Sequence, residues 1–258
     1  MTTNSQPLVV GLLRGLSVLR CFDHGREILG SSEIARITGL PQPTVWRLCK
    51  TLEHAGYLVT TDGGTRFRPG LSILTLGYAA LDSLEIAELA RPFLSEIAAR
   101  FNGAASLSTR EGVSMLYVER CEAKGTVLHI NLRVGSEVPI IRTGTGWGYL
   151  AGRKPAERQA ILAQCKSADP EAYQRFSDPM QAALEQYPAV GYVENVGVFF
   201  PGLTTVAVPL VSETVQTDYV LNCTSPADAL STPALRAEAG EALKMLAERL
   251  RPAILRRN

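Results

Sequence analysis

The sequence predicts an α+β protein whose N-terminal part is a winged helix-turn-helix domain. Three observations predict this class. Residues 12–68 contain, in order, two helical segments, a glycine turn, a third helix that starts at prolines, and a basic hairpin. Beyond residue 85, helices and strands are mixed without the regular alternation of a doubly wound sheet. The chain has 258 residues, more than one typical domain of roughly 100–200 residues, so we expect two domains.

The first helix is expected in "LLRGLSVLRCF". Leu12, Leu16, Leu19 and Phe22 recur there at helical spacing, which predicts that they form its buried side.

A short second helix is expected to run through Ile37, with Ser31 or Ser32 as its N-cap. Gly39 is expected to end it, because glycine readily adopts the left-handed conformation that follows many helices.

The third helix is expected to start near Pro41 and Pro43, since proline is tolerated in the first turn of a helix, and to end before Gly56. Its apolar positions follow an i, i+3, i+4, i+7 pattern that predicts one buried stripe, made of Val45, Leu48, Cys49 and Leu52.

A hairpin is expected in "YLVTTDGGTRFRPG", where two short alternating runs flank a "DGG" turn. In its second strand, Phe67 is expected to face inward, while Arg66 and Arg68 face outward.

The face of the third helix opposite the apolar stripe carries Thr44, Arg47 and Thr51. Such side chains contact base edges and phosphates when a helix enters the major groove. A solvated helix face is one alternative, and a winged helix used only for protein contacts is another. The order of the elements and the basic wing favour binding to double-stranded DNA.

The predicted DNA contacts are Ser32, Gln42, Pro43, Thr44, Trp46, Arg47, Lys50, Arg66 and Arg68. Gln42, Thr44 and Arg47 are expected to contact bases. Lys50 and the two wing arginines are expected to contact phosphates.

Charge and composition agree with this organisation. Residues 1–70 carry eight Lys/Arg and five Asp/Glu, whereas the rest of the chain carries 18 and 20, and a basic N-terminal part suits nucleic-acid binding. No apolar run reaches the roughly 18 residues that cross a bilayer, and no secretory signal is evident. The five scattered cysteines are typical of buried reduced thiols. We therefore expect a cytoplasmic protein with no membrane partner.

The rest of the chain mixes helices and strands. Helices are expected at 71–84, at 85–101, and at about 146–164, 171–187 and 233–252. Strands are expected in "ASLSTREGVSMLYVERCE", "TVLHINLRVGSEVPI", "GYVENVGVFFPGLTTVAVPL" and "DYVLNCTSP". The helix at 71–84 is apolar on two sides, which fits either a linker helix that pairs with a second subunit or a plain core helix.

This layout resembles the IclR family of bacterial transcription regulators over nearly the whole chain. "RGLSVLRCF" is similar to the family's first helix, "SSEIARITGLPQPTVWRLCKTLEHAGYL" to its helix-turn-helix, and "FRPGLSILTLGYAAL" to the start of its linker helix. "LRVGSEVPIIRTGTGWGYLA", "GLTTVAVPL" and "LNCTSP" resemble segments of its effector domain.

The resemblance implies a winged helix-turn-helix domain at 1–70, a linker helix at 71–84 and a GAF-like effector-binding domain at 85–258. It also implies a homodimer or homotetramer that is not an enzyme. A small organic acid bound to the C-terminal domain would change how the N-terminal domains bind operator DNA, for repression or activation. The effector positions implied are Gly144, Thr145, Asn195, Thr205, Asn222 and Thr224, with Met115 and Ile140 as apolar wall.

Some positions depart from the family pattern. Gly146-Trp147 stands where Gly-Lys is usual, Asn195 where an acid is frequent, and Thr205 where Cys is frequent. A pocket with Trp147 nearby and no acid at Asn195 favours a larger, flatter ligand, such as an aromatic acid. "PIIRTGTGWGYLA" also resembles members that govern aromatic-compound catabolism. Arg142 is then a candidate partner for a carboxylate, or else a solvated surface residue.

The sequence lacks familiar catalytic patterns. "GTGWG" matches neither the dinucleotide-binding pattern G-x-G-x-x-G nor the nucleophile pattern G-x-S-x-G. No histidine lies at metal-ligand spacing from another His or Cys, and His129 stands alone in a strand-like run. We expect no catalytic residue, metal or cofactor. A small-molecule enzyme is the alternative, and turnover distinguishes the two, because an effector is recovered unchanged.

Overall fold

The computed structural model describes residues 8–22, 26–126, 132–211 and 218–255. It contains two compact units, Met1–Ser83 and Leu84–Asn258. The first is a winged helix-turn-helix unit with one additional helix, and the second combines an antiparallel sheet with helices on both of its faces. The predicted α+β class is therefore confirmed.

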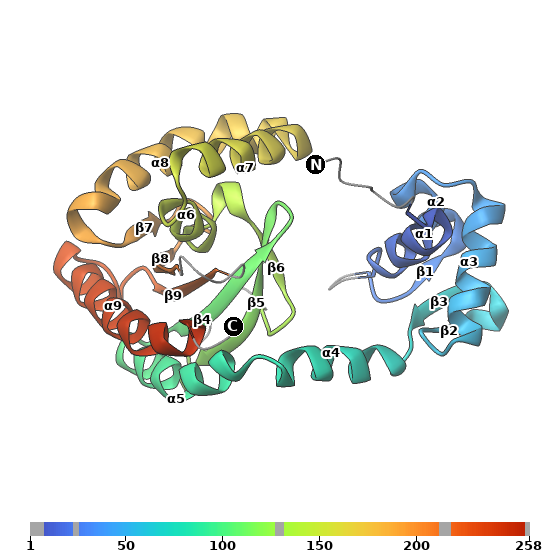
Figure 1. The fold of residues 1–258 in the computed structure, drawn as a ribbon, viewed down its shortest axis with the longest axis horizontal. Helices are drawn as coiled ribbons and strands as arrows, with labels where there is room; N and C mark the ends of the chain where they lie inside the picture. Colours follow the sequence, from blue (N-terminus) through green and yellow to red (C-terminus); the bar gives the residue numbers. More distant parts are fainter. Residues whose placement is uncertain (1–7, 23–25, 127–131, 212–217, 256–258) are drawn as a thin grey trace, which may run out of the picture. The chain divides into compact units, whose positions relative to one another are not determined.

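The N-terminal unit has α1 (Val10–Leu19), α2 (Ser31–Thr38) and α3 (Gln42–His54) packed with a small sheet, and α4 (Ser72–Asp82) leads away from that sheet (Figure 1). The strands are β1 (Leu29–Gly30), β2 (Leu58–Thr61) and β3 (Arg66–Pro69), in the antiparallel order β1-β3-β2. The predicted hairpin is confirmed. The two-residue strand β1 was not predicted, because so short a segment has no alternating pattern.

Helix α2 begins differently from the prediction. Ser31 is its first residue and Gly30 is the N-cap, so the prediction that Ser31 or Ser32 caps the helix is wrong. The Glu33 carboxylate reaches back instead, and its Oε2 accepts a hydrogen bond from the Gly30 N–H at 2.7 Å. Gly39 has φ of 69°, which confirms the left-handed end of the helix.

The predicted stripe of α3 is confirmed, since Val45 and Cys49 are fully buried in the core of the unit with Phe67. The predicted buried face of α1 is confirmed only in part, since Leu19 and Phe22 pack against the core but Leu12 and Leu16 do not. Leu12 and Leu16 are 63% and 47% exposed, whereas Val18 is fully buried. Val18 lies at the centre of the packing of α1 against the core, and, of the regularly spaced leucines, Leu12 and Leu16 face outward.

The C-terminal unit is built on a six-stranded antiparallel sheet in the order β6-β5-β4-β9-β8-β7. Its strands are β4 (Ala104–Glu111), β5 (Ser114–Glu122), β6 (Glu137–Pro139), β7 (Val193–Val196), β8 (Leu203–Leu210) and β9 (Tyr219–Pro226). Its α-helices are α5 (Glu85–Arg100), α6 (Gly144–Ala151), α7 (Pro155–Ala168), α8 (Pro170–Val190) and α9 (Pro233–Leu255). In Figure 1, α5 and α9 lie on one side of the sheet, and α6, α7 and α8 lie on the other.

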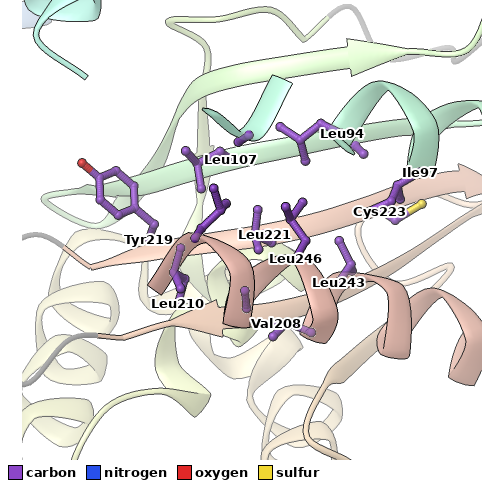
Figure 2. Close-up of a cluster of buried hydrophobic side chains, with 14 of the residues drawn as sticks. Leu94, Ile97, Leu107, Val208, Leu210, Tyr219, Leu221, Cys223, Leu243 and Leu246 are labelled. Atoms are coloured by element: carbon purple, nitrogen blue, oxygen red, sulfur yellow. The ribbon is translucent and has the colours of Figure 1, made fainter. Parts of the chain in front are cut away.

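Each face of this sheet has its own hydrophobic core, because successive side chains of a strand point to opposite faces. Figure 2 shows the core under α5 and α9, where Leu94 and Leu246 meet Leu107 and Leu221 of the sheet. The core on the α6 side contains Trp147 and, from the strands, residues such as Met115, Ala207 and Val220.

The helix predicted at about 146–164 is two helices, α6 and α7. The chain leaves the helix at Gly152, and Pro155 begins the next one. A single hydrophobic pattern across both concealed the break. Part of the strand predicted in "TVLHINLRVGSEVPI", with His129, lies outside the described residues, and β6 is the strand described near its end.

Candidate DNA interface and ligand pocket

The outward face of α3 carries the side chains that the sequence predicted for DNA. Burial of Val45 and Cys49 fixes the rotation of the helix. Most of the opposite face is exposed, namely Gln42, Pro43, Trp46, Arg47 and Lys50, whereas Thr44 is half-buried. The face therefore presents an amide, a guanidinium and an ammonium group to solvent, all of which can donate hydrogen bonds to bases or phosphates.

Trp46 connects α3 to the wing. Its ring meets the ring of Phe67 edge-on, with centroids 5.6 Å apart. The Lys50 ammonium lies 5.7 Å from the Trp46 ring centroid and pairs with Glu53. Hydrogen bonds from Lys50 and Thr60 hold the pKa of Glu53 below its ordinary value. Trp46 thus positions the wing against the helix as well as facing solvent.

The two wing arginines differ. Arg66 Nη2 donates to the backbone oxygen of Ile28 at 2.9 Å and to Glu33 Oε2 at 3.1 Å. Arg68 is exposed, and its Nη1 lies 3.5 Å from the backbone oxygen of Pro69. The expected outward orientation therefore describes Arg68 well, whereas Arg66 ties the wing to the start of α2.

A polar hollow of about 470 Å³ lies where the starts of α2 and α3 meet the wing. It is lined by Gly30, Ser31, Ser32, Glu33, Gln42, Trp46, Thr65 and Arg66. Gln42 Nε2 donates to Ser31 Oγ at 3.3 Å, so the first turns of the two helices are linked. Ser32 is exposed beside this hollow.

The second candidate site is a small cavity on the α6 face of the large sheet. Its volume is about 20 Å³, room for about one water molecule. It is lined by Tyr117, Arg120, Leu132, Thr143, Gly144, Thr145, Asn195, Phe199, Phe200, Leu203, Thr205 and Thr224. Five of the positions predicted for an effector line it, namely Gly144, Thr145, Asn195, Thr205 and Thr224.

Hydroxyl groups form one wall of this cavity. Thr205 and Thr224 share a hydrogen bond of 2.8 Å, and Asn222 Nδ2 donates to Thr224 Oγ1 at 3.3 Å. The Tyr117 hydroxyl lies 3.4 Å from Thr145 Oγ1. Burial raises the pKa of Tyr117, so its hydroxyl keeps its proton at neutral pH.

Asn195 holds two segments of the rim. Its Nδ2 donates to the backbone oxygen of Arg142, and its Oδ1 accepts from the Phe199 N–H, both at 3.1 Å. Arg142 itself is exposed, with its guanidinium 5.5 Å from the Phe199 ring centroid. The structure thus places Arg142 on the outside of the rim, away from the lining.

Three predicted apolar positions lie in the core instead of the lining. Met115, Ile140 and Trp147 are buried in the hydrophobic cluster on the α6 side of the sheet. Trp147 Nε1 donates to the backbone oxygen of Ile141 at 2.8 Å, which satisfies its polar atom within the protein. The contacts of Trp147 therefore favour a role in the core over the expected role in shaping a flat ligand pocket. Asn222 is fully buried outside the lining, where its Nδ2 donates to Thr224 Oγ1.

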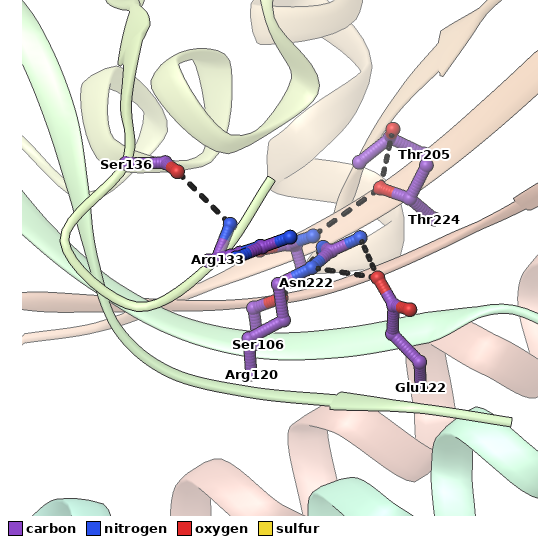
Figure 3. A network of polar contacts seen from close by, with 8 residues as sticks. All are labelled: Ser106, Arg120, Glu122, Arg133, Ser136, Thr205, Asn222 and Thr224. Carbon is purple, nitrogen blue, oxygen red and sulfur yellow. Dashed lines mark hydrogen bonds and ion pairs between the residues drawn. The ribbon is translucent and has the colours of Figure 1, made fainter. Parts of the chain in front are cut away.

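Arg120 is a lining residue that the sequence reasoning missed. Its side chain is only 5% exposed, and its Nη1 lies 3.3 Å from Ser106 Oγ, while Nη2 lies 2.8 Å from Glu122 Oε1. Figure 3 shows this network, with Asn222, Thr205 and Thr224 beside it. The other lining residues missed are Tyr117, Leu132, Thr143, Phe199, Phe200 and Leu203.

A β-bulge in β5 turns Arg120 into the cavity. The ladder pairs Leu107 with Glu119 but Ser108 with Tyr117, so Val118 is the extra residue. Val118 belongs to the core under α5, and Glu119 pairs with Arg91 of α5. Tyr117 and Arg120 therefore share the cavity face although they are three residues apart.

Two kinds of feature are absent from the described parts of the chain. They contain no group of three or more His, Cys, Asp or Glu residues placed to hold a metal ion. None of the helices there combines the length and the apolar character that a bilayer span requires. All five cysteines lie in described ranges as free thiols, four of them buried and Cys121 half-buried.

Two protein-family models match the chain, one in its N-terminal part and one in its C-terminal part. Residues 11–62 match the IclR helix-turn-helix domain, and residues 78–251 match the bacterial transcriptional regulator IclR C-terminal domain. The chain is similar to the Pca regulon regulatory protein of Pseudomonas putida, with 30% identity over 85% of this chain and 75% of that protein.

Solved structures have the same fold. The crystal structure of an IclR family transcriptional regulator from Brucella abortus is 31% identical, with a TM-score of 0.88 over 98% of this chain and 96% of that chain. An IclR homologue from Microbacterium hydrocarbonoxydans, crystallised with 4-hydroxybenzoate, is 22% identical, with a TM-score of 0.71 over 95% of this chain and 99% of that chain.

Proposed function

This chain belongs to the IclR family of bacterial transcription regulators, and from this premise we propose that it binds a specific operator under the control of a small organic acid. The observation that carries the DNA-binding proposal is the rotation of α3. Burial of Val45 and Cys49 leaves Gln42 and Arg47 exposed together on the opposite face. Such a face is suited to the major groove.

Arg47 and Gln42 are the proposed base-reading residues, with Thr44 beside them. Arginine forms bidentate hydrogen bonds to guanine, and glutamine forms them to adenine. Lys50 and Arg68 are the proposed phosphate contacts. We assign Arg66 to the structure of the wing, because its guanidinium is engaged by Glu33 and Ile28.

The cavity beside the start of α6 is the proposed effector site. Five positions that the family resemblance implied converge on it from α6, β7, β8 and β9. An aromatic acid is one candidate class, because a solved homologue of the same fold was crystallised with 4-hydroxybenzoate. The effector is proposed to be released unchanged, as in a regulator and not in an enzyme.

Self-association is part of the proposal. Every residue of α4 is at least partly exposed, although the helix is rich in apolar side chains. Leu74 and Tyr78 are 52% and 62% exposed, and Leu12 and Leu16 of α1 are exposed as well. Apolar surface of this kind marks an interaction site. A homodimer that contacts two operator half-sites, with residues 71–84 as its linker, accounts for it.

The effector is proposed to control DNA binding through its different affinities for different arrangements of the dimer. An effector changes DNA binding only if it binds one arrangement of the dimer more tightly than another.

The protein is proposed to act in the cytoplasm.

Fluorescence anisotropy tests the proposal directly. The purified protein is titrated onto labelled DNA from the region upstream of its own coding sequence, and onto shuffled DNA, at one fixed salt concentration. The titration is repeated with aliphatic and aromatic acids, and the acids are recovered afterwards. Specific binding that one acid shifts, with that acid recovered unchanged, is the expected result. Equal binding to both DNAs contradicts the choice of operator, and a chemically altered acid contradicts the non-enzymatic role.

A further inference from the structure

We infer that Arg120 binds the carboxylate of the effector and is the residue that makes this pocket select anions. The inference rests on the proposed function, since it takes the cavity beside α6 as the effector site. It replaces Arg142, the arginine that the sequence had suggested for this role.

The burial of Arg120 is the first argument. A charged side chain is seldom left buried unless an opposite charge or good hydrogen bonds compensate its lost hydration. Arg120 is 5% exposed, whereas its partner Glu122 is 49% exposed. The partner is thus largely in water, and the guanidinium is held inside the protein beside a cavity.

The second argument is the unused part of the guanidinium. An arginine side chain has five N–H donors in a planar fork. Its described hydrogen bonds go from Nε and Nη2 to Glu122 Oε1 and from Nη1 to Ser106 Oγ, and its Cζ lies 5.7 Å from the Tyr117 ring centroid. Each terminal nitrogen has a second N–H beyond these contacts, so the edge between Nη1 and Nη2 can take a carboxylate in bidentate geometry.

The third argument is the charge of the lining. Among the described residues that line the cavity, Arg120 is the sole charged one, and the others supply hydroxyl, amide and apolar groups. The N-terminal end of α6, at Gly144 and Thr145, adds a positive dipole end to the same lining. A ligand carboxylate can accept from the donors that Arg120 does not use for Glu122 and can interact favourably with the positive end of α6, which a neutral or cationic ligand does less well.

Arg142 lacks these properties. It is exposed and lies over the Phe199 ring at the rim. An exposed guanidinium gains little from a single ligand carboxylate, because water competes for its donors and salt screens its charge.

Acid and amide pairs test the inference. Wild type, Arg120→Gln, Arg142→Gln and Arg100→Gln are titrated with 4-hydroxybenzoate, benzoate and pyruvate, and with the primary amide of each. Binding is measured by isothermal calorimetry and by the shift in thermal unfolding temperature. Arg100→Gln is the matched control, because Arg100 also pairs with a glutamate but lies on α5 away from the cavity.

The expected result is that at least one acid binds the wild type and its amide does not. Arg120→Gln then weakens that acid by about thirtyfold, as removal of a charged hydrogen-bond partner predicts. Arg142→Gln and Arg100→Gln change the affinity less than threefold, on the order of the scatter for exposed charges. Arg120→Lys keeps the positive charge but lacks the planar set of donors, so it is expected to bind the acid about tenfold more weakly than wild type. This variant also tests the inference if Arg120→Gln does not fold.

Three outcomes overturn the inference. Equal affinity of the acid for wild type and Arg120→Gln shows that another group binds the carboxylate, and leaves the proposed function intact. Preference for an amide over its acid shows that the pocket does not select anions. The third outcome is that the wild type binds its operator but none of these compounds raises its unfolding temperature. This result contradicts both the carboxylate contact and control by these acids, whereas the DNA-binding part of the proposed function stands.

Discussion

The guanidinium of Arg142 lies over the ring of Phe199, 5.5 Å from its centroid, and Asn195 is hydrogen-bonded to the backbone of both residues. This contact lies at the rim of the cavity, whose volume of about 20 Å³ holds no more than about one water molecule. Any organic acid must therefore displace part of the rim. Phe199 is half-buried in the segment between β7 and β8, where it packs at the margin of the hydrophobic cluster on the α6 side of the sheet.

Replacing Phe199 with alanine is expected to enlarge the cavity and change which acids fit. The affinity for benzoate-sized acids should rise about fivefold, because the ring no longer has to be displaced, and that for pyruvate should fall. The free energy of unfolding should decrease by about 1–2 kcal/mol, since the ring is only half-buried. Calorimetry and urea unfolding measure both effects. A uniform loss of affinity for all acids contradicts this role.

Arg47→Ala is expected to weaken binding to the cognate operator by about 1–3 kcal/mol and to relax specificity at one base position. Anisotropy with the operator and its single-base variants measures the effect. An equal loss on shuffled DNA assigns Arg47 to a phosphate instead.

The two wing arginines are expected to behave differently when each is changed to alanine. Arg68→Ala should reduce the salt dependence of DNA binding, with the slope of log K against log salt smaller by about 0.9 for each phosphate that the variant no longer neutralises. Arg66→Ala should lower the free energy of unfolding by about 1 kcal/mol, because it removes the hydrogen bonds to Ile28 and Glu33. Salt titrations and urea unfolding of both variants separate the two roles. The assignment fails if Arg66→Ala changes the salt slope and leaves stability unaltered.

Leu74→Glu is expected to shift the protein from dimer toward monomer, because it places a charge in the exposed apolar surface of α4. Thr75→Glu is the matched control, since it adds the same charge at the neighbouring exposed polar position. Sedimentation velocity measures the change. If both variants sediment like wild type, α4 is not the interface.

Alkaline pH is expected to destabilise the N-terminal unit through Cys49. Burial raises the pKa of the Cys49 thiol from 9.0 to about 11. Between those values the unfolded chain releases this proton while the folded protein retains it, so the free energy of unfolding falls as pH rises through that window. Urea unfolding of wild type and Cys49→Ala at several pH values measures the difference. Identical slopes for the two proteins contradict the prediction.

Local patterns predicted the winged helix-turn-helix well. The stripe of α3 follows from spacing within one helix, and its start follows from the fixed geometry of Pro41 and Pro43. The role of Arg66 did not follow, because its partner Glu33 lies 33 positions away in the sequence and meets it only in the folded unit.

In the cavity, too, the sequence indicated some of the residues, whereas others meet only in the folded protein. Gly144, Thr145, Asn195, Thr205 and Thr224 were implied by the family resemblance, and the structure brings them together. Arg120 was not predicted. Strict alternation along β5 from Tyr117 places Glu119 on the cavity face and Arg120 on the opposite one. The bulge at Val118 reverses that assignment, and nothing in the local composition marks it.

That bulge has a consequence for how ligand preference can evolve. Glu119 and Arg120 are neighbours of opposite sign, and the backbone decides which of them faces the cavity. A relative that kept all four residues from Tyr117 to Arg120 but paired them without a bulge would present the Glu119 carboxylate to its ligand and favour cations. Its net charge and composition would be unchanged. If Arg120 binds the effector as proposed, the register of β5 sets the charge of the ligand, and a comparison of charged residues alone does not show it.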